Sequence, residues 1–118
     1  MDVAYDYAEQ AKMMKAFCDE NRLKILAQLR GGEQCACRLL DHLEIGQSAL
    51  SYHMKILIES GVVESRECGK WTHYRLSAQG SARAIAAMQA ILTPNERAEG
   101  KARHGASCGC AVSDGTRG

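Results

Sequence analysis

The sequence lacks long apolar runs, although 46% of its 118 residues are hydrophobic. Because a helix that spans a bilayer needs about 20 consecutive apolar residues, we expect no membrane span. The N-terminal region also lacks a basic segment followed by an apolar stretch, the pattern typical of a signal peptide. We therefore expect a cytoplasmic protein, and the length suits a single domain.

An excess of charge of either sign is also absent. Fifteen Lys and Arg residues against fourteen Asp and Glu residues give a formal net charge of +1. A dedicated nucleic-acid-binding domain is more often visibly basic, so the overall charge gives little support for DNA binding. Support for that function has to come from the local arrangement of side chains.

A Cys-x-x-Cys motif is missing, and so is the alternation of strands and helices that surrounds this motif in thiol–disulfide enzymes. We therefore expect no enzyme. Six cysteines are present, four of them in the Cys-x-Cys pairs Cys35 with Cys37 and Cys108 with Cys110. Structural disulfides are uncommon in the reducing cytoplasm, so these spacings favour unpaired thiols with metal or redox chemistry.

Hydrophobic periodicity predicts a mainly helical fold. Apolar residues three and four positions apart predict helices over residues 3–17, 20–30, 38–43, 47–60 and 78–92. Suitable N-caps for three of them are Asp19, Gln47 or Ser48, and Ser77. The side chains expected to face the core include Leu23, Ile25, Leu26, Leu29, Leu39, Leu40, Leu43, Leu50, Met54, Leu57 and Ile58.

After Gly61 the pattern changes to extended chain. Residues 63–66 and 72–76 favour strands, and Gly69 between them suits a hairpin turn. Two short helices across a turn at residues 44–46, followed by this hairpin, predict a winged helix-turn-helix in which the hairpin is the wing. We assign this domain to residues 1–92. Residues 93–118 contain five glycines and no apolar periodicity, and they are expected to form a flexible tail that carries Cys108 and Cys110.

Polar side chains on the helix over residues 47–60 form a stripe opposite its apolar face. In a helix-turn-helix the N-terminal part of the second helix enters the major groove, so we expect this helix to be the recognition helix. The expected base contacts are Gln47, Ser48, Ser51 and Tyr52, and the expected phosphate contacts are Lys55 and, in the wing, Arg66, Lys70 and Arg75. Trp71 is expected to pack rather than bind. The alternative for the wing is a solvated hairpin without a partner.

Four motifs stand between about Phe17 and Leu76: Cys18-Asp-Glu-Asn-Arg-Leu-Lys-Ile-Leu, Glu33-Gln-Cys-Ala-Cys, Gln47-Ser-Ala-Leu-Ser-Tyr-His-Met and Gly69-Lys-Trp-Thr-His-Tyr-Arg-Leu. In these motifs the chain closely resembles the ArsR/SmtB family of metal-responsive repressors. The resemblance implies a homodimer formed largely by the first and last helices. It also implies binding to double-stranded operator DNA and release when metal binds. An apolar stripe on the last helix, typical of a surface that packs on a partner subunit, comprises Ile85, Met88, Ile91 and Leu92.

The segment from Glu33 to Cys37 is similar to the metal-binding box of the arsenic and antimony branch, in which a third cysteine follows three residues later. Leu40 stands at that position here. Trivalent arsenic is a soft centre that prefers thiolates. We therefore expect arsenite, and antimonite as a related inducer, to bind Cys35 and Cys37, with the third thiolate from Cys108 or Cys110. The carboxylate and histidine ligands of the zinc-sensing branch have no counterparts in residues 78–92.

Cysteines two positions apart in a regular helix point about 200° apart. A ligand that bridges Cys35 and Cys37 would then unwind their helix, shift the recognition helix beside it and lower the DNA affinity. Cys18 is expected to be a packed core cysteine and only a reserve ligand, and Cys68 to be exposed. His42 and His53 are expected to be structural or to face DNA.

Two other repressors of the same fold stay open. One responds to cadmium or lead, although that branch adds cysteines near the N-terminus and none precedes Phe17 here. The other responds to thiol oxidation by forming a disulfide. A tail that only buffers metal, with no part in regulation, is a further alternative.

Overall fold

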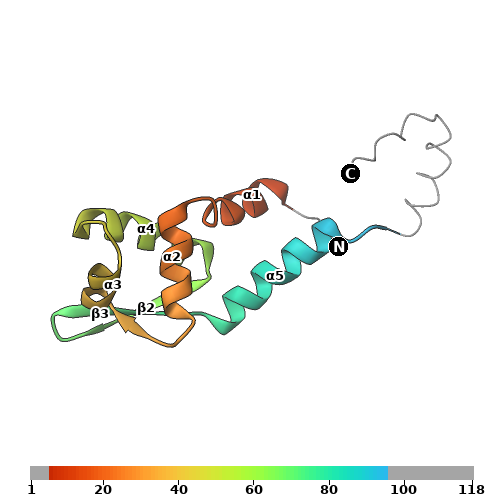
Figure 1. Ribbon diagram of the computed structural model, residues 1–118. Coiled ribbons are helices and arrows are strands. Elements are labelled where there is room, and N and C mark those ends of the chain that lie inside the picture. The colour runs from red at the N-terminus through yellow and green to blue at the C-terminus, as the bar shows by residue number, and fades with distance from the viewer. Residues whose placement is uncertain (1–5, 96–118) are drawn as a thin grey trace. The chain divides into compact units, whose positions relative to one another are not determined.

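The computed structural model describes residues 6–95. Within them the chain forms α1 (Tyr7–Lys15), α2 (Glu20–Leu29), β1 (Gln34–Cys35), α3 (Ala36–His42), α4 (Gln47–Ser60), β2 (Val63–Cys68), β3 (Trp71–Leu76) and α5 (Ala78–Leu92). The predicted winged helix-turn-helix is confirmed, with α3 and α4 as the helix-turn-helix and the β2–β3 hairpin as the wing (Figure 1). The chain divides into two units between Met88 and Gln89.

Two of the predicted N-caps are present. The Asp19 carboxylate accepts hydrogen bonds from the backbone N–H groups of Asn21 and Arg22, at 2.9 and 3.1 Å. The Ser77 hydroxyl accepts one from the Gly80 N–H at 3.0 Å. Each cap satisfies N–H groups that have no acceptor inside the helix, so α2 and α5 begin where the sequence predicts.

The N-cap of α4 and the length of α1 differ from the predictions. Neither Gln47 nor Ser48 caps α4, because both are already helical and the N-cap is Gly46, which has no side chain. The first helix is shorter than residues 3–17: it follows the N-cap Asp6 and ends at Lys15. It ends there because the next three N–H groups bond carbonyls three residues back, the tighter pattern of a turn.

The predicted inward faces of α2, α3 and α4 are confirmed except at two residues. Leu23 is 51% exposed and Ile58 is 37% exposed. A helix turns by about 100° per residue. Leu23, two residues before the buried Ile25, therefore points away from the core. Ile58 follows the buried Leu57 and lies at the edge of the buried face of α4. The buried core comprises Ala16, Ile25, Leu29, Leu39, Leu43, Leu50, Met54, Leu57, Val62, Val63, Tyr74 and Ala84.

The hairpin is longer than predicted, and it gains a third strand. Strands β2 and β3 pair in antiparallel register from Val63 with Leu76 to Cys68 with Trp71, and Gly69 takes a left-handed φ of +66° in the turn. The sequence did not predict β1, which pairs antiparallel with β3 and places Cys35 opposite His73. A strand of two residues is too short to leave a periodic pattern. As a result, Cys35 belongs to the same sheet as the wing.

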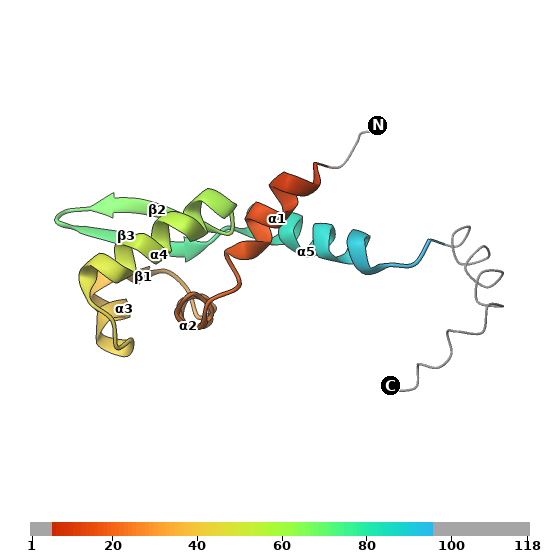
Figure 2. The same ribbon diagram turned by 90° about the horizontal axis from the view of Figure 1, so that it is seen from above.

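The recognition helix lies at the centre of the packing. Helix α4 runs along the hairpin (Figure 2) and contacts β2. Helices α1 and α2 also contact α4, and α3 contacts β3. Strand β1 and helix α3 each contact β3, so a displacement of either reaches the wing directly. Helix α3 is linked to α4 through the turn at residues 43–46.

The first and last helices leave apolar surface uncovered in the single chain. No residue of α1 is buried, and its Ala8 and Ala11 are exposed. On α5, Ile85 is 59% exposed and Met88 is 39% exposed. Among the residues that the structure describes, no helix is long and apolar enough to cross a membrane.

Candidate functional site

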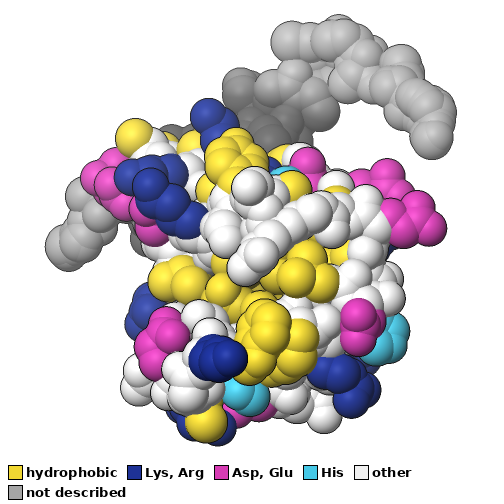
Figure 3. Space-filling view, turned by 90° about the vertical axis from the view of Figure 1, so that its left-hand side faces the viewer, with side chains coloured by type: hydrophobic (Ala, Val, Ile, Leu, Met, Phe, Trp, Pro, Cys, Tyr) yellow, Lys and Arg dark blue, Asp and Glu magenta, His cyan; other side chains and the backbone are white. Residues whose placement is uncertain are grey.

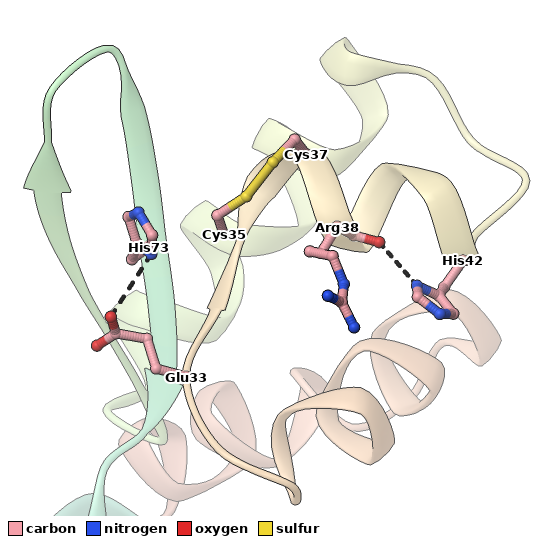
Figure 4. The surroundings of a disulfide bond; sticks show 6 residues. All are labelled: Glu33, Cys35, Cys37, Arg38, His42 and His73. Atoms are coloured by element: carbon pink, nitrogen blue, oxygen red, sulfur yellow. Dashed lines mark hydrogen bonds and ion pairs between the residues drawn. A yellow bond between two sulfur atoms is a disulfide. The ribbon is translucent and has the colours of Figure 1, made fainter.

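Cys35 and Cys37 lie where β1 ends and α3 begins (Figure 4). Cys35 is the N-cap of α3 and has an extended backbone, with φ −81° and ψ 157°. The two Sγ atoms form a disulfide, with the Cα atoms 5.4 Å apart. The prediction that these thiols are unpaired is therefore wrong. The prediction that they point to opposite sides of a helix is also wrong, because α3 begins at Ala36 and Cys35 lies outside it. The sulfurs meet without any unwinding of α3.

The remaining cysteines do not join this pair within residues 6–95. Cys18 is exposed, so its predicted place in the core is wrong: it follows the end of α1, and its Sγ lies 3.7 Å from the Met14 carbonyl. Cys68 is exposed, as predicted. Cys108 and Cys110 lie outside the described residues. In the described part of the chain, no three His, Cys, Asp or Glu side chains are arranged to hold a metal ion.

The polar stripe of α4 is exposed along its whole length, whereas Leu50, Met54 and Leu57 on the opposite side are buried. Figure 3 views the side of the molecule that carries α3, the start of α4 and the end of the hairpin: hydrophobic and white, uncharged surface occupies its middle, and both Lys or Arg and Asp or Glu side chains lie around it. The Lys and Arg side chains are the groups that contact DNA phosphates. The exposed members of the stripe are Gln47, Ser48, Ser51, Tyr52 and Lys55.

Two of the three wing cations are paired with carboxylates. The Arg66 guanidinium donates three hydrogen bonds to Glu33, from Nε to both carboxylate oxygens at 3.1 Å and from Nη2 to Oε2 at 2.7 Å. Arg75 Nε donates one to Glu64 at 2.8 Å. The hydrogen bonds from their arginines lower the pKa of both carboxyls. Lys70 is exposed beside the hairpin turn.

The wing residue Trp71 does not pack in the core as predicted. It is 45% exposed, because it pairs with Cys68 at the turn end of the hairpin, beyond the part that α4 covers. The aromatic ring therefore stands on the surface together with Lys70.

Glu33 also approaches the second strand of the hairpin. Its Oε2 lies 3.5 Å from His73 Nδ1, and the close-up shows Glu33 and His73 beside the disulfide (Figure 4). One carboxylate thus contacts both β2 and β3 while standing two residues before Cys35. Sequence periodicity does not predict this arrangement, because Glu33 and Arg66 are 33 positions apart.

A buried network holds the recognition helix from inside. Arg22 Nε donates to the Ala16 carbonyl at 2.9 Å, and its Nη1 lies 3.0 Å from His53 Nδ1. Because arginine has no acceptor, His53 Nδ1 must accept this bond. His53 Nε2 lies 3.8 Å from the Asp19 carboxylate. The network joins the end of α1, the start of α2 and the middle of α4, and it confirms a structural role for His53.

A family model described as "Bacterial regulatory protein, arsR family" matches residues 19–65. Over 91 residues the chain is 37% identical to an arsenical resistance operon repressor of Staphylococcus aureus, which covers 77% of this chain and 88% of that relative. A repressor of the same name from Staphylococcus xylosus is 41% identical over 71 residues, or 60% of this chain and 68% of the relative. The chain belongs to the ArsR family.

The structure of this ArsR-family chain is also similar to solved structures. An ArsR-like transcriptional regulator from Rhodococcus sp. RHA1 superimposes with a TM-score of 0.65 at 30% identity, covering 91% of this chain and 96% of that one. ArsR-family proteins regulate transcription through their DNA-binding domain. The chain is therefore a transcription regulator and not an enzyme.

Proposed function

We propose that this regulator is a repressor of an arsenical resistance operon, which releases its DNA when As(III), or the related Sb(III), binds its cysteine thiolates. The observation that carries the proposal is the position of Cys35 and Cys37, whose sulfurs lie side by side at the junction of β1 and α3. Once reduced, two adjacent thiolates can bind one soft ion together. The names of the two staphylococcal relatives support arsenic as that ion.

The repressor binds operator DNA as a homodimer in this proposal, and so acts in the cytoplasm. Covering the exposed apolar residues of α1 and α5 by a second copy removes them from water. The dimer then presents two recognition helices to successive major grooves. Gln47, Ser48, Ser51 and Tyr52 contact base edges, while Lys55, Arg66, Lys70 and Arg75 contact phosphates.

The third thiolate comes from Cys108 or Cys110 in this proposal. Leu40 stands where the arsenic branch carries its third cysteine, and the Leu40 side chain packs against the core instead. Residues 93–118 then act as a tail separate from the domain over residues 1–92, and they complete the site from the same subunit or its partner. Cys18, exposed near the end of α1, is the reserve ligand.

The test is fluorescence anisotropy of the full-length protein on DNA from its own promoter, titrated with arsenite without oxygen and with a phosphine reductant. Arsenite should release the wild type, whereas Cys35→Ser should stay bound. Cys108→Ser/Cys110→Ser should need a much higher arsenite concentration. Cys68→Ser, which removes an exposed thiol from the wing, is the matched control and should respond like the wild type. Continued binding of the reduced wild type at all arsenite concentrations would refute the arsenic assignment.

A thiol-redox repressor is the second candidate, and the Cys35–Cys37 disulfide is the observation that favours it. In that case a two-electron oxidant such as diamide takes two electrons and two protons from the thiols as the S–S bond forms. Diamide without arsenite should then release the DNA, and reductant should restore binding. A protein that arsenite releases and diamide does not is a metalloid sensor only.

A further inference from the structure

We propose that Glu33 is a positioning residue that transmits occupation of the Cys35–Cys37 pair to the wing, through its ion pair with Arg66. The inference rests on the proposed function and extends it, because it assigns the wing a second route of control beside α3 and α4. In this view the ligand acts on both DNA-binding elements at once.

The first observation is the position of the cysteine pair between two elements. Cys35 belongs to β1, which is hydrogen-bonded to β3 in the wing's sheet, and Cys37 belongs to α3 of the helix-turn-helix. A ligand that draws the two residues into its own coordination geometry therefore pulls on the sheet and on the helix. Movement of α3 shifts α4, whereas movement of β1 shifts the wing.

The second observation is the geometry of the Glu33–Arg66 ion pair. Three donor–acceptor contacts join the two side chains, at 3.1, 3.1 and 2.7 Å. A forked contact of this kind fixes orientation as well as distance, which a single-point contact does not. Glu33 stands two residues before Cys35, and Arg66 lies in the middle of β2, on the strand farthest from β1. The pair thus crosses the whole sheet.

The third observation is where the charge lies. Arg66 is one of the cations expected to contact a DNA phosphate, and its side chain is 57% exposed. Glu33 holds the same guanidinium through Nε and Nη2. A displacement of residues 33–37 moves the carboxylate and redirects the guanidinium. The phosphate contact of the wing then depends on the state of the cysteine pair.

The neighbouring Glu64–Arg75 ion pair provides a matched control. It joins a carboxylate to an arginine on the same hairpin, with a contact of 2.8 Å. Both of its residues lie within the hairpin, and neither is close in sequence to the cysteine pair. Glu33→Gln and Glu64→Gln remove the same charge and each break a carboxylate–arginine pair of the wing, and Glu33→Gln also alters the contact with His73. The two variants differ in whether the broken pair reaches the cysteine segment.

The experiment measures the coupling factor, which is the ratio of the DNA dissociation constants with and without saturating arsenite. Allosteric coupling typically amounts to about 5- to 150-fold. We expect Glu33→Gln to reduce the factor about fivefold and Glu64→Gln to leave it unchanged. Both variants should bind DNA somewhat more tightly without arsenite, because each removes a negative charge beside an arginine that is expected to contact a phosphate. Direct titration of arsenite should show unchanged binding to the Glu33→Gln thiols.

A double-mutant cycle separates this role from a general effect on structure. Arg66→Gln should lose the same part of the coupling factor, and Glu33→Gln/Arg66→Gln should lose no more than either single variant. Equal coupling in Glu33→Gln, Glu64→Gln and the wild type would overturn the inference while leaving the proposed function intact. If arsenite fails to release even the wild type, the proposed function itself is wrong, and the inference falls with it.

Discussion

The two sides of the DNA-binding unit are held in different ways. On one side, α4 is fixed by the buried contact of Arg22 with His53 and by the close approach of α5 to the end of α4. On the other side, the wing is held by the Glu33–Arg66 and Glu64–Arg75 ion pairs, which are exposed to solvent. Buried polar contacts are costly to break, whereas exposed ion pairs are exchanged at little cost. The contrast indicates that the wing is moved at a lower cost in free energy than the recognition helix.

The close approach of α5 to α4 should give the largest effect on stability. A Cβ added at Gly80 would lie 1.6 Å from the carbonyl oxygen of Gly61 and 2.5 Å from its carbonyl carbon, and both of these Gly61 atoms belong to the backbone. We therefore expect Gly80→Ala to lower the free energy of unfolding by about 3 kcal/mol or more. Gly46→Ala is the control, because an added Cβ there meets nothing within 4 Å. Urea denaturation measures both, and equal midpoints for the two variants would contradict the packing described here.

Arg22 should give the next largest effect. Arg22→Ala leaves the His53 ring and the Ala16 carbonyl without their buried donor, so we expect a loss of about 3 kcal/mol in the free energy of unfolding. Arg30→Ala removes an exposed arginine at the other end of α2 and should change stability by less than about 0.5 kcal/mol. If both variants unfold at the same urea concentration, the buried network does not hold α4.

His53→Gln tests the same network with a milder change. The glutamine amide cannot fill the space of the ring, so the free energy of unfolding should fall. Because the amide can still accept a hydrogen bond from Arg22, the fall should be smaller than that of Arg22→Ala. Because DNA binding requires α4 in its place, the DNA affinity should fall together with stability. A variant of normal stability and weak DNA binding would show that His53 acts on DNA rather than on the position of α4.

The helices and caps could be predicted from the sequence, whereas the contacts that hold α4 and the wing could not, and the reason is physical. Helices, inward faces and the caps Asp19 and Ser77 depend on residues close together in the chain, and these predictions were confirmed except at the residues named above. The Glu33–Arg66 ion pair joins residues that are 33 positions apart, and the Arg22–His53 contact joins residues that are 31 positions apart. The periodicity of apolar residues cannot predict contacts between residues so distant in the chain. The exposure of Leu23 shows the same limit, since an apolar side chain at a helical position can still face away from the core.

The cysteine pair shows how one missed element changes a chemical prediction. The expectation of opposed thiols assumed that Cys35 is helical. Strand β1 is only two residues long, and it gives Cys35 an extended backbone at the start of α3. Binding of a soft ion by the two thiolates does not depend on whether Cys35 is helical. The proposed route from the ligand to the DNA-binding elements does depend on it, because the ligand need not unwind α3 and acts first on the junction of β1 and α3.

Salt dependence of DNA binding should give the smallest effect, and it compares cations within the wing. Arg66 and Arg75 face carboxylates, whereas Lys70 has no ion-pair partner among residues 6–95. Each phosphate contact adds about one to the slope of log affinity against log salt. Lys70→Gln should therefore reduce the slope by about one. Arg66→Gln should reduce it by less, because the Glu33 carboxylate partly offsets the positive charge that Arg66 presents to a phosphate.

Lys24→Gln is the control for this comparison, because Lys24 pairs with Glu20 on α2, at 3.0 Å, outside the wing and the recognition helix. Its slope should equal that of the wild type when anisotropy is measured from about 50 to 200 mM salt. A larger change for Arg66→Gln than for Lys70→Gln would mean that Arg66 is free of Glu33 on DNA. In that case the Glu33–Arg66 ion pair opens when DNA is bound, and it cannot transmit the state of the cysteine pair to the DNA-bound wing.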